Sequence, residues 1–370
     1  MASRAIRTIL CGMGNVNRSF VEILASHQQS LEERYGARFV IVGATDSGGA
    51  AIDARGLSVQ QLIDCKLAKR SVASLERVGH AGLDGVQVME RLLHEPESEG
   101  EQARVDLVLE ATPVVKAREG RLQQPALDTI RYAVKHGVPC VLANKGPLAF
   151  EYQSLMQLAR EHQTKIRFSA CVGGALPTID IGRRDLVGCH IQRVEAVLNG
   201  TTHSMLRAIE SGVAYDEALR DAQRRGIAET DPSLDVDGWD AAFKLVIVAN
   251  AVLNQPSTLH DVDVQGITNV TVADLQAATS RQERVVLLCS ATKNQSPAAS
   301  PERHWNLSVK PTPLPIDHPL ARMHADEMGV VYHTDIAGIA SATTLERGPK
   351  PTAAAMLRDA LHILCPQVIE

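Results

Sequence analysis

Aromatic residues are scarce in this chain, at 3% of its 370 positions, so we expect a core built mainly from aliphatic side chains. There is no long basic run, and the formal net charge is -5, which argues against nucleic acid or an anionic membrane as a partner. The 7 cysteines are scattered without a CxxC pair. This pattern predicts reduced thiols in the cytoplasm rather than a disulfide framework or a zinc site.

Long apolar runs are also missing, since the longest are about ten residues and too short to span a bilayer. A strand-like run already begins at Ile6, which leaves no room for a signal peptide. The hydrophobic share of 45% and the charged share of 22% are typical of a soluble globular protein, and the length suggests two domains.

The first part of the chain alternates strands rich in Val, Ile and Leu with helices, which predicts a parallel sheet covered by helices on both faces. After Lys145 the pattern changes to a mixture of helices and strands. The predicted strands are residues 5–11, 39–44, 105–110, 138–142, 192–198, 305–311 and 330–336. The predicted helices follow residue 17 and cover 126–134, 148–161, 204–209, 214–224, 239–253, 274–279 and 352–364, with polar loops at 95–101 and 297–302.

A glycine-rich turn joins the first strand to the first helix. Gly12 permits a tight turn and Gly14 lets the backbone approach a pyrophosphate at the helix N-terminus, so this context predicts a dinucleotide-binding site that includes Asn15 and Val16. Asp46 follows the second strand, where a carboxylate meets the adenosine ribose and favours NAD. Arg38 and Arg55 could instead reach a 2′-phosphate, so NAD and NADP both remain open.

A second polar segment places five carboxylates between Glu229 and Asp240 and then Lys244, just before an apolar helical run. Asp240 and Lys244 are four residues apart and share one helix face. A lysine beside carboxylates at the edge of a core can hold a polar substrate and exchange a proton with it. The alternative is an ion pair on a solvated helix surface.

Several motifs in order along the chain resemble homoserine dehydrogenases. They are the turn 12–17, VLANKGPLA at 141–149, FSACVGGALP at 168–177, NGTT at 199–202, the acidic segment 229–244 and RGPKPTAAAMLRD at 347–359. The resemblance implies interconversion of L-homoserine and L-aspartate 4-semialdehyde with NAD or NADP, in threonine and methionine biosynthesis. It also implies an α/β fold with a Rossmann-like domain and a mixed α/β catalytic and dimerisation domain, in a homodimer.

The resemblance also assigns domains and site residues. Residues 1–146, completed by 338–370, are expected to bind the dinucleotide, and 147–337 to bind substrate and dimerise. The expected catalytic residues are Lys145, Lys244 and Asp240, and the expected substrate ligands are Gly200, Thr201, Glu229 and Asp235. The expected cofactor contacts are Gly12, Gly14, Asn15, Val16, Asp46, Thr112, Asn144 and Gly348.

The chain departs from the family pattern at several places, among them Ile227, where the family often has an aromatic residue near the substrate. Asn17 replaces the third glycine, and Ser169 stands where a monovalent-cation site often has a glutamate. Backbone carbonyls of Val172, Gly174 and Leu176 match the other cation ligands, so sodium binding stays open. The chain ends before a regulatory ACT domain, so we expect none. The alternative functions are a dehydrogenase of the same scaffold acting on another amino-acid alcohol or semialdehyde, and a non-catalytic dinucleotide-binding sensor.

Overall fold

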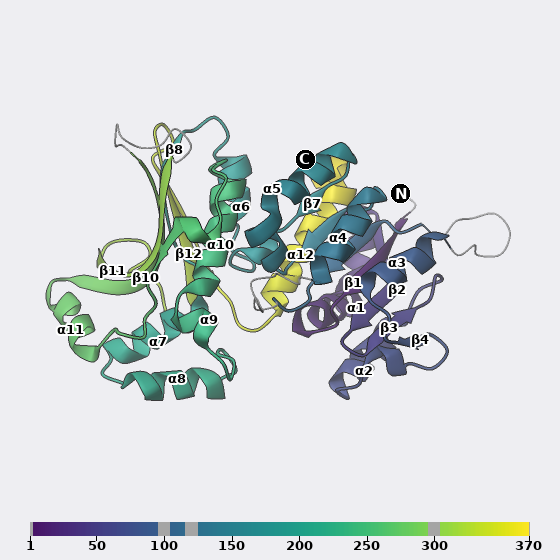
Figure 1. Cartoon of the computed structure of the whole chain (residues 1–370), viewed down its shortest axis with the longest axis horizontal. Helices are drawn as coiled ribbons and strands as arrows, with labels where there is room; N and C mark the ends of the chain where they lie inside the picture. Colours follow the sequence, from purple (N-terminus) through teal and green to yellow (C-terminus); the bar gives the residue numbers. More distant parts are fainter. Residues whose placement is uncertain (1–2, 95–103, 115–124, 295–303, 370) are drawn as a thin grey trace. The chain divides into compact units, whose positions relative to one another are not determined.

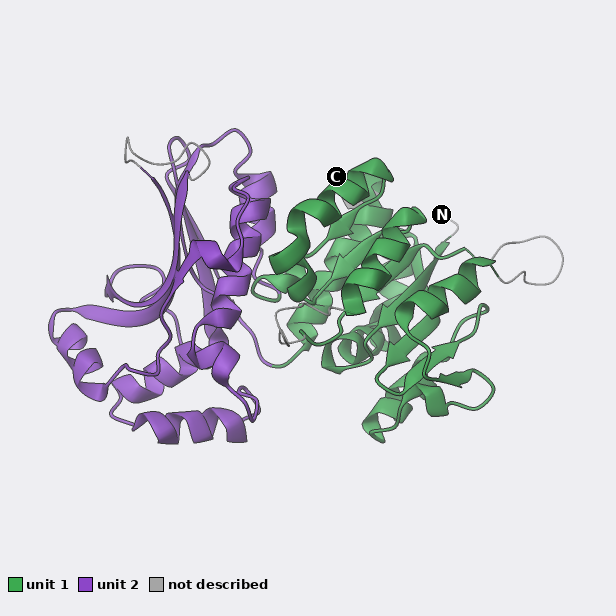
Figure 2. Cartoon of the chain, in the orientation of Figure 1, with its two compact units in different colours: residues 1–174, 348–370 green, residues 175–347 purple. Residues whose placement is uncertain are grey.

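The computed structural model describes residues 3–94, 104–114, 125–294 and 304–369 (Figure 1). The polar loops predicted at 95–101 and 297–302 lie outside these ranges. Within them, no helix has both the length and the apolar character needed to cross a membrane. The chain forms two compact units, residues 1–174 with 348–370, and residues 175–347 (Figure 2).

Unit 1 contains a seven-stranded sheet with the strand order β4-β3-β2-β1-β5-β6-β7 and helices on both of its faces (Figure 1). The strands are β1 (Arg4–Cys11), β2 (Ala37–Asp46), β3 (Gly49–Ile52), β4 (Gly79–Ala81), β5 (Leu107–Glu110), β6 (Cys140–Leu142) and β7 (Ile166–Arg167). The helices are α1 (Asn15–Tyr35), α2 (Val59–Leu67), α3 (Gly85–His94), α4 (Pro125–Lys135), α5 (Gly146–Glu161), α12 (Lys350–Leu364) and α13 (Pro366–Ile369).

The central strands of unit 1 are parallel, as predicted, because their nearly continuous apolar sequences are buried on both faces. β3 and β4 are antiparallel, so the sheet is mixed rather than wholly parallel. Cys11 at the end of β1 is paired with Thr45 on β2 and with Glu110 on β5. The carboxyl ends of these strands therefore form one edge, and the strand order reverses direction beside β1, where such folds bind ligands.

Helix α12, near the C-terminus, belongs to the core of unit 1. Its Ala353, Met356 and Ala360 pack in the same apolar cluster as residues of α1 and β1. Its Asp359 is fully buried and accepts hydrogen bonds from the backbone N–H and the hydroxyl of Ser169, both at 2.8 Å. These contacts explain why the end of the chain returns to the first unit.

Unit 2 contains a six-stranded sheet with the order β13-β12-β8-β10-β11-β9. The strands are β8 (Ile191–Val197), β9 (Val262–Val264), β10 (Glu283–Lys293), β11 (Trp305–Pro315), β12 (Glu327–Thr334) and β13 (Ile339–Leu345). The helices are α6 (Thr178–Asp180), α7 (Gly200–Glu210), α8 (Tyr215–Arg224), α9 (Ser233–Val236), α10 (Trp239–Ala251) and α11 (Val272–Ser280). The sheet is antiparallel except for β9, which pairs parallel with β11.

Helices α7, α10 and α11 contact β10, while Leu320, Ala321 and Met323 form an apolar cluster with side chains of β8, β10, β11 and β12. Helix α10 is buried along almost its whole length, because its sequence after Lys244 is apolar except for Asn250. Polar groups on this helix therefore need partners inside the unit.

The boundaries of the compact units differ from the predicted ones at 146/147 and 337/338. The first boundary lies at Gly174, because the strand β7 that follows α5 pairs with β6 and extends the first sheet. The second lies at Arg347, because β13 pairs with β12 in the second sheet. The sequence change after Lys145 coincides with the start of α5, which lies within unit 1.

Candidate active site

The glycine turn presents backbone at the sheet edge of unit 1. Gly12 has φ +83°, and a Cβ placed there would lie 2.8 Å from the backbone of Thr112, so only glycine fits. Gly14 lies just before α1, and a Cβ placed there would meet nothing within 4 Å. Gly14 and Asn15 are exposed, and Val16 is half-buried. The first N–H groups of α1 are thus accessible to an anion such as a pyrophosphate.

Asn17 replaces a glycine in this turn and stabilises it. Its side-chain amide donates to the carbonyls of Cys11 at 2.9 Å and Gly12 at 3.2 Å, and the side chain is fully buried. The departure from the family pattern therefore adds hydrogen bonds between helix and strand instead of loosening their packing.

The carboxylate of Asp46 is surrounded by donors. It accepts from Lys66 Nζ at 2.7 Å, from the Ser71 hydroxyl at 2.6 Å, and from the N–H groups of Val72 at 2.9 Å and Gly48 at 3.0 Å. Burial alone would raise the pKa of Asp46, but these hydrogen bonds outweigh it and lower the pKa below its ordinary value. A ribose hydroxyl at Asp46 would have to share or displace one of these donors.

The cation beside Asp46 is Lys66, and neither predicted arginine occupies that place. Arg38 is the second residue of β2 and Asp46 the last, so their Cα atoms are about 26 Å apart at roughly 3.3 Å per residue. Arg55 follows β3, which runs back along β2, and the next residues pair with Ile41. A 2′-phosphate at the end of β2 would therefore meet Lys66.

The loops after β5 and β6 are joined by hydrogen bonds near Lys145. Glu110 accepts from the N–H of Thr112 at 2.8 Å and from its hydroxyl. Asn144 donates to the Thr112 hydroxyl at 3.1 Å and accepts from the N–H of Gly146 at 3.0 Å. Lys145 is half-buried at the residue before α5. Three of the predicted residues, Thr112, Asn144 and Lys145, thus lie at one edge of the sheet.

Unit 2 contains a connected network of the predicted acidic and basic residues. Lys244 Nζ donates to Asp240 Oδ2 at 2.7 Å and to the carbonyl of Leu198 at 2.6 Å. Asn199 donates to the same oxygen of Asp240 at 2.8 Å and to Asp235 at 2.7 Å. The side chains of Lys244 and Asp240 are only 14% and 10% exposed, so this pair does not lie on a solvated helix surface.

Asn199 determines where the other predicted substrate ligands lie. It is the N-cap of α7 and accepts from the N–H of Thr202 at 2.8 Å, so Gly200 and Thr201 form the first turn beside the network. The Thr201 hydroxyl donates to the carbonyl of Ile227 at 3.0 Å. Glu229 is exposed on the loop between α8 and α9.

Sequence reasoning missed Asn199 and Glu346 as members of this region. Glu346 accepts from the N–H of Ala175, and the charge of Lys244 acts on it. Burial raises the pKa of Glu346, although the backbone donors of Ala175 and Leu176 and the nearby Lys244 lower it in part. The N-cap preference for asparagine between a strand and a helix could have indicated Asn199, whereas no local signal indicates Glu346.

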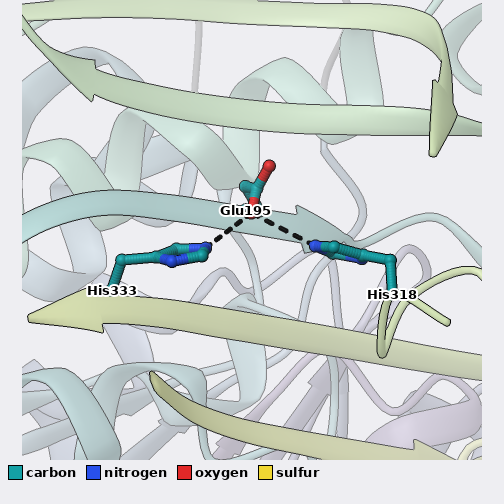
Figure 3. A group of neighbouring side chains, drawn as sticks. All are labelled: Glu195, His318 and His333. Atoms are coloured by element: carbon teal, nitrogen blue, oxygen red, sulfur yellow. Dashed lines mark hydrogen bonds and ion pairs between the residues drawn. The ribbon is translucent and has the colours of Figure 1, made fainter. Parts of the chain in front are cut away.

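Another polar cluster lies on the sheet of unit 2, where His318 and His333 point at Glu195 from opposite sides (Figure 3). Their Nε2 atoms lie 3.3 and 2.7 Å from Glu195 Oε2, and Arg193 lies 3.2 Å from the same oxygen. The N–H of Leu320 donates to Nδ1 of His318, so Nε2 of a neutral His318 carries the proton. Nε2 of a neutral His318 is thus a donor to Glu195, whereas Nε2 of His333 also lies 3.2 Å from the guanidinium of Arg193, which can only donate.

The comparisons with known proteins agree with the geometry of both units. The family model "Homoserine dehydrogenase, NAD binding domain" matches residues 12–169, and the model "Homoserine dehydrogenase" matches residues 177–361. A homoserine dehydrogenase of Methanocaldococcus jannaschii is 32% identical over 360 residues, covering 96% of this chain and 97% of that protein. The chain belongs to the homoserine dehydrogenase family.

Two further relatives extend this result. An NAD(+)-dependent homoserine dehydrogenase of Pseudomonas canavaninivorans is 31% identical over 355 residues, covering 96% of this chain and 95% of that protein. The crystal structure of an Archaeoglobus fulgidus protein assigned as a homoserine dehydrogenase has a TM-score of 0.80 at 28% identity, covering 97% of this chain and 99% of that one. The predicted α/β fold class, with a Rossmann-like NAD-binding domain and a mixed α/β catalytic domain, is confirmed. The chain is an oxidoreductase of this family.

Proposed function

We propose that the chain interconverts L-homoserine and L-aspartate 4-semialdehyde with NAD or NADP, and that the residues described above do so in the roles expected from the sequence. The observation that carries the proposal is the buried network of Lys244, Asp240, Asn199 and Asp235 in unit 2. The family model of the NAD-binding domain matches residues 12–169, which lie in the first unit. A dinucleotide sensor without catalysis needs no buried lysine–carboxylate pair.

In unit 1, the turn at Gly12 and Gly14, with Asn15 and Val16, is proposed to bind the pyrophosphate through backbone N–H groups. The adenosine ribose is assigned to Asp46 at the end of β2, on one side of β1. The nicotinamide then lies on the other side, near Thr112 and Asn144. Gly348, with φ +73° just before α12, is proposed to complete this cofactor site.

In unit 2, Glu229 and Asp235 are proposed to accept hydrogen bonds from the substrate ammonium, and Gly200 and Thr201 to contact its polar groups. An ammonium has three N–H donors. Asp240 and Leu198 receive two of those of Lys244, so the third can be directed at the substrate oxygen. Lys145 is proposed as the second lysine that handles the proton.

Oxidation removes a hydride from the alcohol carbon of homoserine and a proton from its oxygen, which leaves the aldehyde. When bound, the nicotinamide supplies the hydride acceptor. In oxidation, the lysine that takes the alcohol proton does so as a neutral amine and becomes an ammonium, while the other residues orient the alcohol. In reverse, that ammonium donates the proton to the aldehyde oxygen.

Assembly and location are further parts of the proposal. Strand β13 is an edge strand whose Ile339 and Leu345 are 65% and 53% exposed, and such an edge suits self-association. We propose a homodimer, which sedimentation analysis would test. The seven free cysteines, six of them buried, support a cytoplasmic location.

The monovalent cation is kept as a separate proposal. Its expected ligands are the backbone carbonyls of Val172, Gly174 and Leu176. The Ser169 hydroxyl, at the position of the missing glutamate, donates to Asp359, which places a buried carboxylate near this segment. Activity measured with sodium, potassium or neither at constant ionic strength would test the proposal.

The reaction is tested by incubating the purified protein with L-homoserine and NAD⁺ or NADP⁺, and with L-aspartate 4-semialdehyde and the reduced cofactors. We expect a homoserine-dependent rise in absorbance with at least one cofactor, and the ratio of kcat/KM values gives the cofactor preference. No turnover in either direction with either cofactor would refute the proposed reaction.

A further inference from the structure

The side chain of Glu110, the last residue of β5, is fully buried in the sheet of unit 1. Its Oε2 atom has no hydrogen-bond partner among the residues that the structure describes. The neighbouring titratable groups are two thiols on the adjacent strands, Cys11 on β1 and Cys140 on β6. Burial raises the pKa of both thiols, and the charge of Glu110 raises it further. A charged carboxylate in such surroundings is costly unless it is paired and hydrogen-bonded.

The other oxygen, Oε1, organises the loops at the sheet edge. It accepts from both the N–H and the hydroxyl of Thr112, so the loop after β5 is fixed in two places. Asn144 donates to the same hydroxyl and accepts the N–H of Gly146, the first residue of α5. Thr112 also packs against Gly12, where even a Cβ would be too close. One carboxylate thus connects the loops that follow β1, β5 and β6.

We propose that Glu110 is a positioning residue for the nicotinamide end of the cofactor, because it holds Thr112 and Asn144 in place beside Lys145. This inference rests on the proposed placement of the cofactor in unit 1. Glu110 has no contact with the reacting atoms in this role and acts through its neighbours. A carboxylate accepts stronger hydrogen bonds than a neutral acid or an amide, so the rigidity of the loops depends on its charge.

The ionisation of Glu110 falls in the range where an enzyme assay can follow it. Burial raises its pKa from 4.5 to about 7, although hydrogen bonds from Thr112 and Asn144 lower it in part. Below this pH the acid keeps its proton and holds Thr112 through a weaker, neutral acceptor. Above it, the carboxylate holds Thr112 firmly. The affinity for NAD⁺ is therefore expected to rise as the pH increases through 7.

The test is the dissociation constant for NAD⁺, or for NADP⁺ if that cofactor binds more tightly, measured by calorimetry from pH 6 to 8.5. Glu110→Gln replaces the carboxylate with a neutral acceptor of the same shape. We expect it to weaken binding on the order of tenfold at pH 8, as expected for the loss of a charge-assisted hydrogen bond, and to remove the pH dependence. Unchanged affinity and an unchanged pH profile would overturn the proposal.

Two further variants make the result specific. Thr112→Val removes one donor to Oε1 and should shift the midpoint of the pH profile upward, which also serves if Glu110→Gln does not fold. Asp106→Asn is the matched control, because Asp106 is a buried carboxylate just before β5, at the opposite end of the strand. It should change stability without changing the cofactor affinity or its pH dependence. An equal loss of affinity in Asp106→Asn would show a general structural effect and contradict the positioning role.

This binding assay is independent of homoserine turnover. A protein that binds the cofactor with the expected pH dependence but does not oxidise homoserine would refute the proposed reaction and keep the role of Glu110. If the protein oxidises homoserine but Glu110→Gln binds the cofactor as the wild type does, the proposed reaction is supported and the role of Glu110 is refuted.

Discussion

The two units present their candidate sites with different parts of the chain. In unit 1, the candidate site at the sheet edge consists of the backbone turn around Gly12 and Gly14. Buried side chains such as Asn17 and Glu110 hydrogen-bond to the backbone of this turn and of the adjacent loop. In unit 2, side chains form the site directly, through the network of Asp240 and Lys244. A backbone site is sensitive to added bulk, whereas a side-chain site is sensitive to the loss of a functional group.

The buried carboxylates of the two sites also differ in what surrounds them. Asp240 lies 2.7 Å from the Nζ of Lys244, so its charge has a cationic partner. The hydrogen bonds to Glu110 come from Thr112 and Asn144, which are both neutral. The buried carboxylate of unit 2 thus has a cationic hydrogen-bond partner, whereas the buried carboxylate of unit 1 has neutral partners and a pKa that burial raises to about 7.

The largest expected effect follows from removing the ammonium group of Lys244 in unit 2. Lys244→Met keeps much of the aliphatic stem and deletes the ammonium. Loss of a general acid or base costs about 10²–10⁴-fold in rate, so kcat should fall by this amount while the affinity for the cofactor changes little. Steady-state kinetics and cofactor calorimetry measure both quantities.

The matched control for Lys244→Met is Lys310→Met. Lys310 also pairs with a carboxylate, that of Asp263, but this pair lies at the surface, with 38% and 68% of the two side chains exposed. Its loss should leave kcat within about twofold of wild type, because exposed ion pairs contribute little. A Lys244→Met enzyme as active as Lys310→Met would show that the buried pair is only structural.

The next effect concerns the stability of unit 1. The pKa of Glu110 is about 7 in the folded state and 4.5 as the ordinary value, so the folded state binds more protons between these values. The contribution of Glu110 to the free energy of unfolding should therefore be largest below pH 4.5. It should fall by up to about 3 kcal/mol as the pH rises to 7. Denaturant unfolding at several pH values should show this slope in the wild type and not in Glu110→Gln.

Asp46 provides the opposite sign for the same experiment. Despite burial, hydrogen bonds from Lys66 and its neighbours lower the pKa of Asp46 below 3.8, so its contribution to stability is present above that value and is lost as the pH falls through the folded-state pKa. Asp46→Asn should therefore reduce the loss of stability in acid and leave the slope between pH 4.5 and 7 intact. Identical pH profiles of the two variants would mean that the two carboxylates do not differ as described.

Bulk added to the backbone site should weaken cofactor binding without unfolding the protein. A Cβ at Gly14 meets nothing within 4 Å and its φ of -82° suits any residue, so Gly14→Val is compatible with the fold. The valine would stand where the pyrophosphate approaches the helix. We expect a loss of about 10–100-fold in cofactor affinity, as for lost hydrogen bonds to a charged group, and an intermediate loss for Gly14→Ala. Unchanged affinity in both would place the cofactor elsewhere.

The sequence predicted local features of this fold well. The strand, glycine turn and helix at the start of the chain, and the apolar helix α10, follow from patterns within a few residues of one another. Strand β10 was missed, although it lies inside the second sheet between β8 and β11. A continuous apolar run such as Val285–Cys289 does not distinguish a buried strand from a buried helix.

The candidate site shows the same limit. Motifs indicated Asp240 and Lys244, whose contact depends only on helical spacing. They did not indicate the partners that come from distant parts of the chain, such as Lys66 at Asp46 or Asn199 at Asp240. Those contacts join residues that are far apart in the sequence. They depend on how the strands and helices pack, which local sequence patterns do not reveal.

The smallest expected effect concerns Glu229, the predicted substrate ligand that the structure leaves exposed. Its proposed partner is the substrate ammonium, which is not attached to the carbon that loses the hydride. Glu229→Gln should therefore act on KM and leave kcat nearly unchanged. A solvent-exposed ion pair contributes up to about 1 kcal/mol, which corresponds to roughly a fivefold increase in KM for homoserine. Glu217→Gln is the matched control, because Glu217 is an exposed glutamate on the neighbouring helix α8. If both variants have the wild-type KM, Glu229 does not bind the substrate, and the ammonium must be held within the buried network, where Asn199 lies 2.7 Å from Asp235 and 2.8 Å from Asp240.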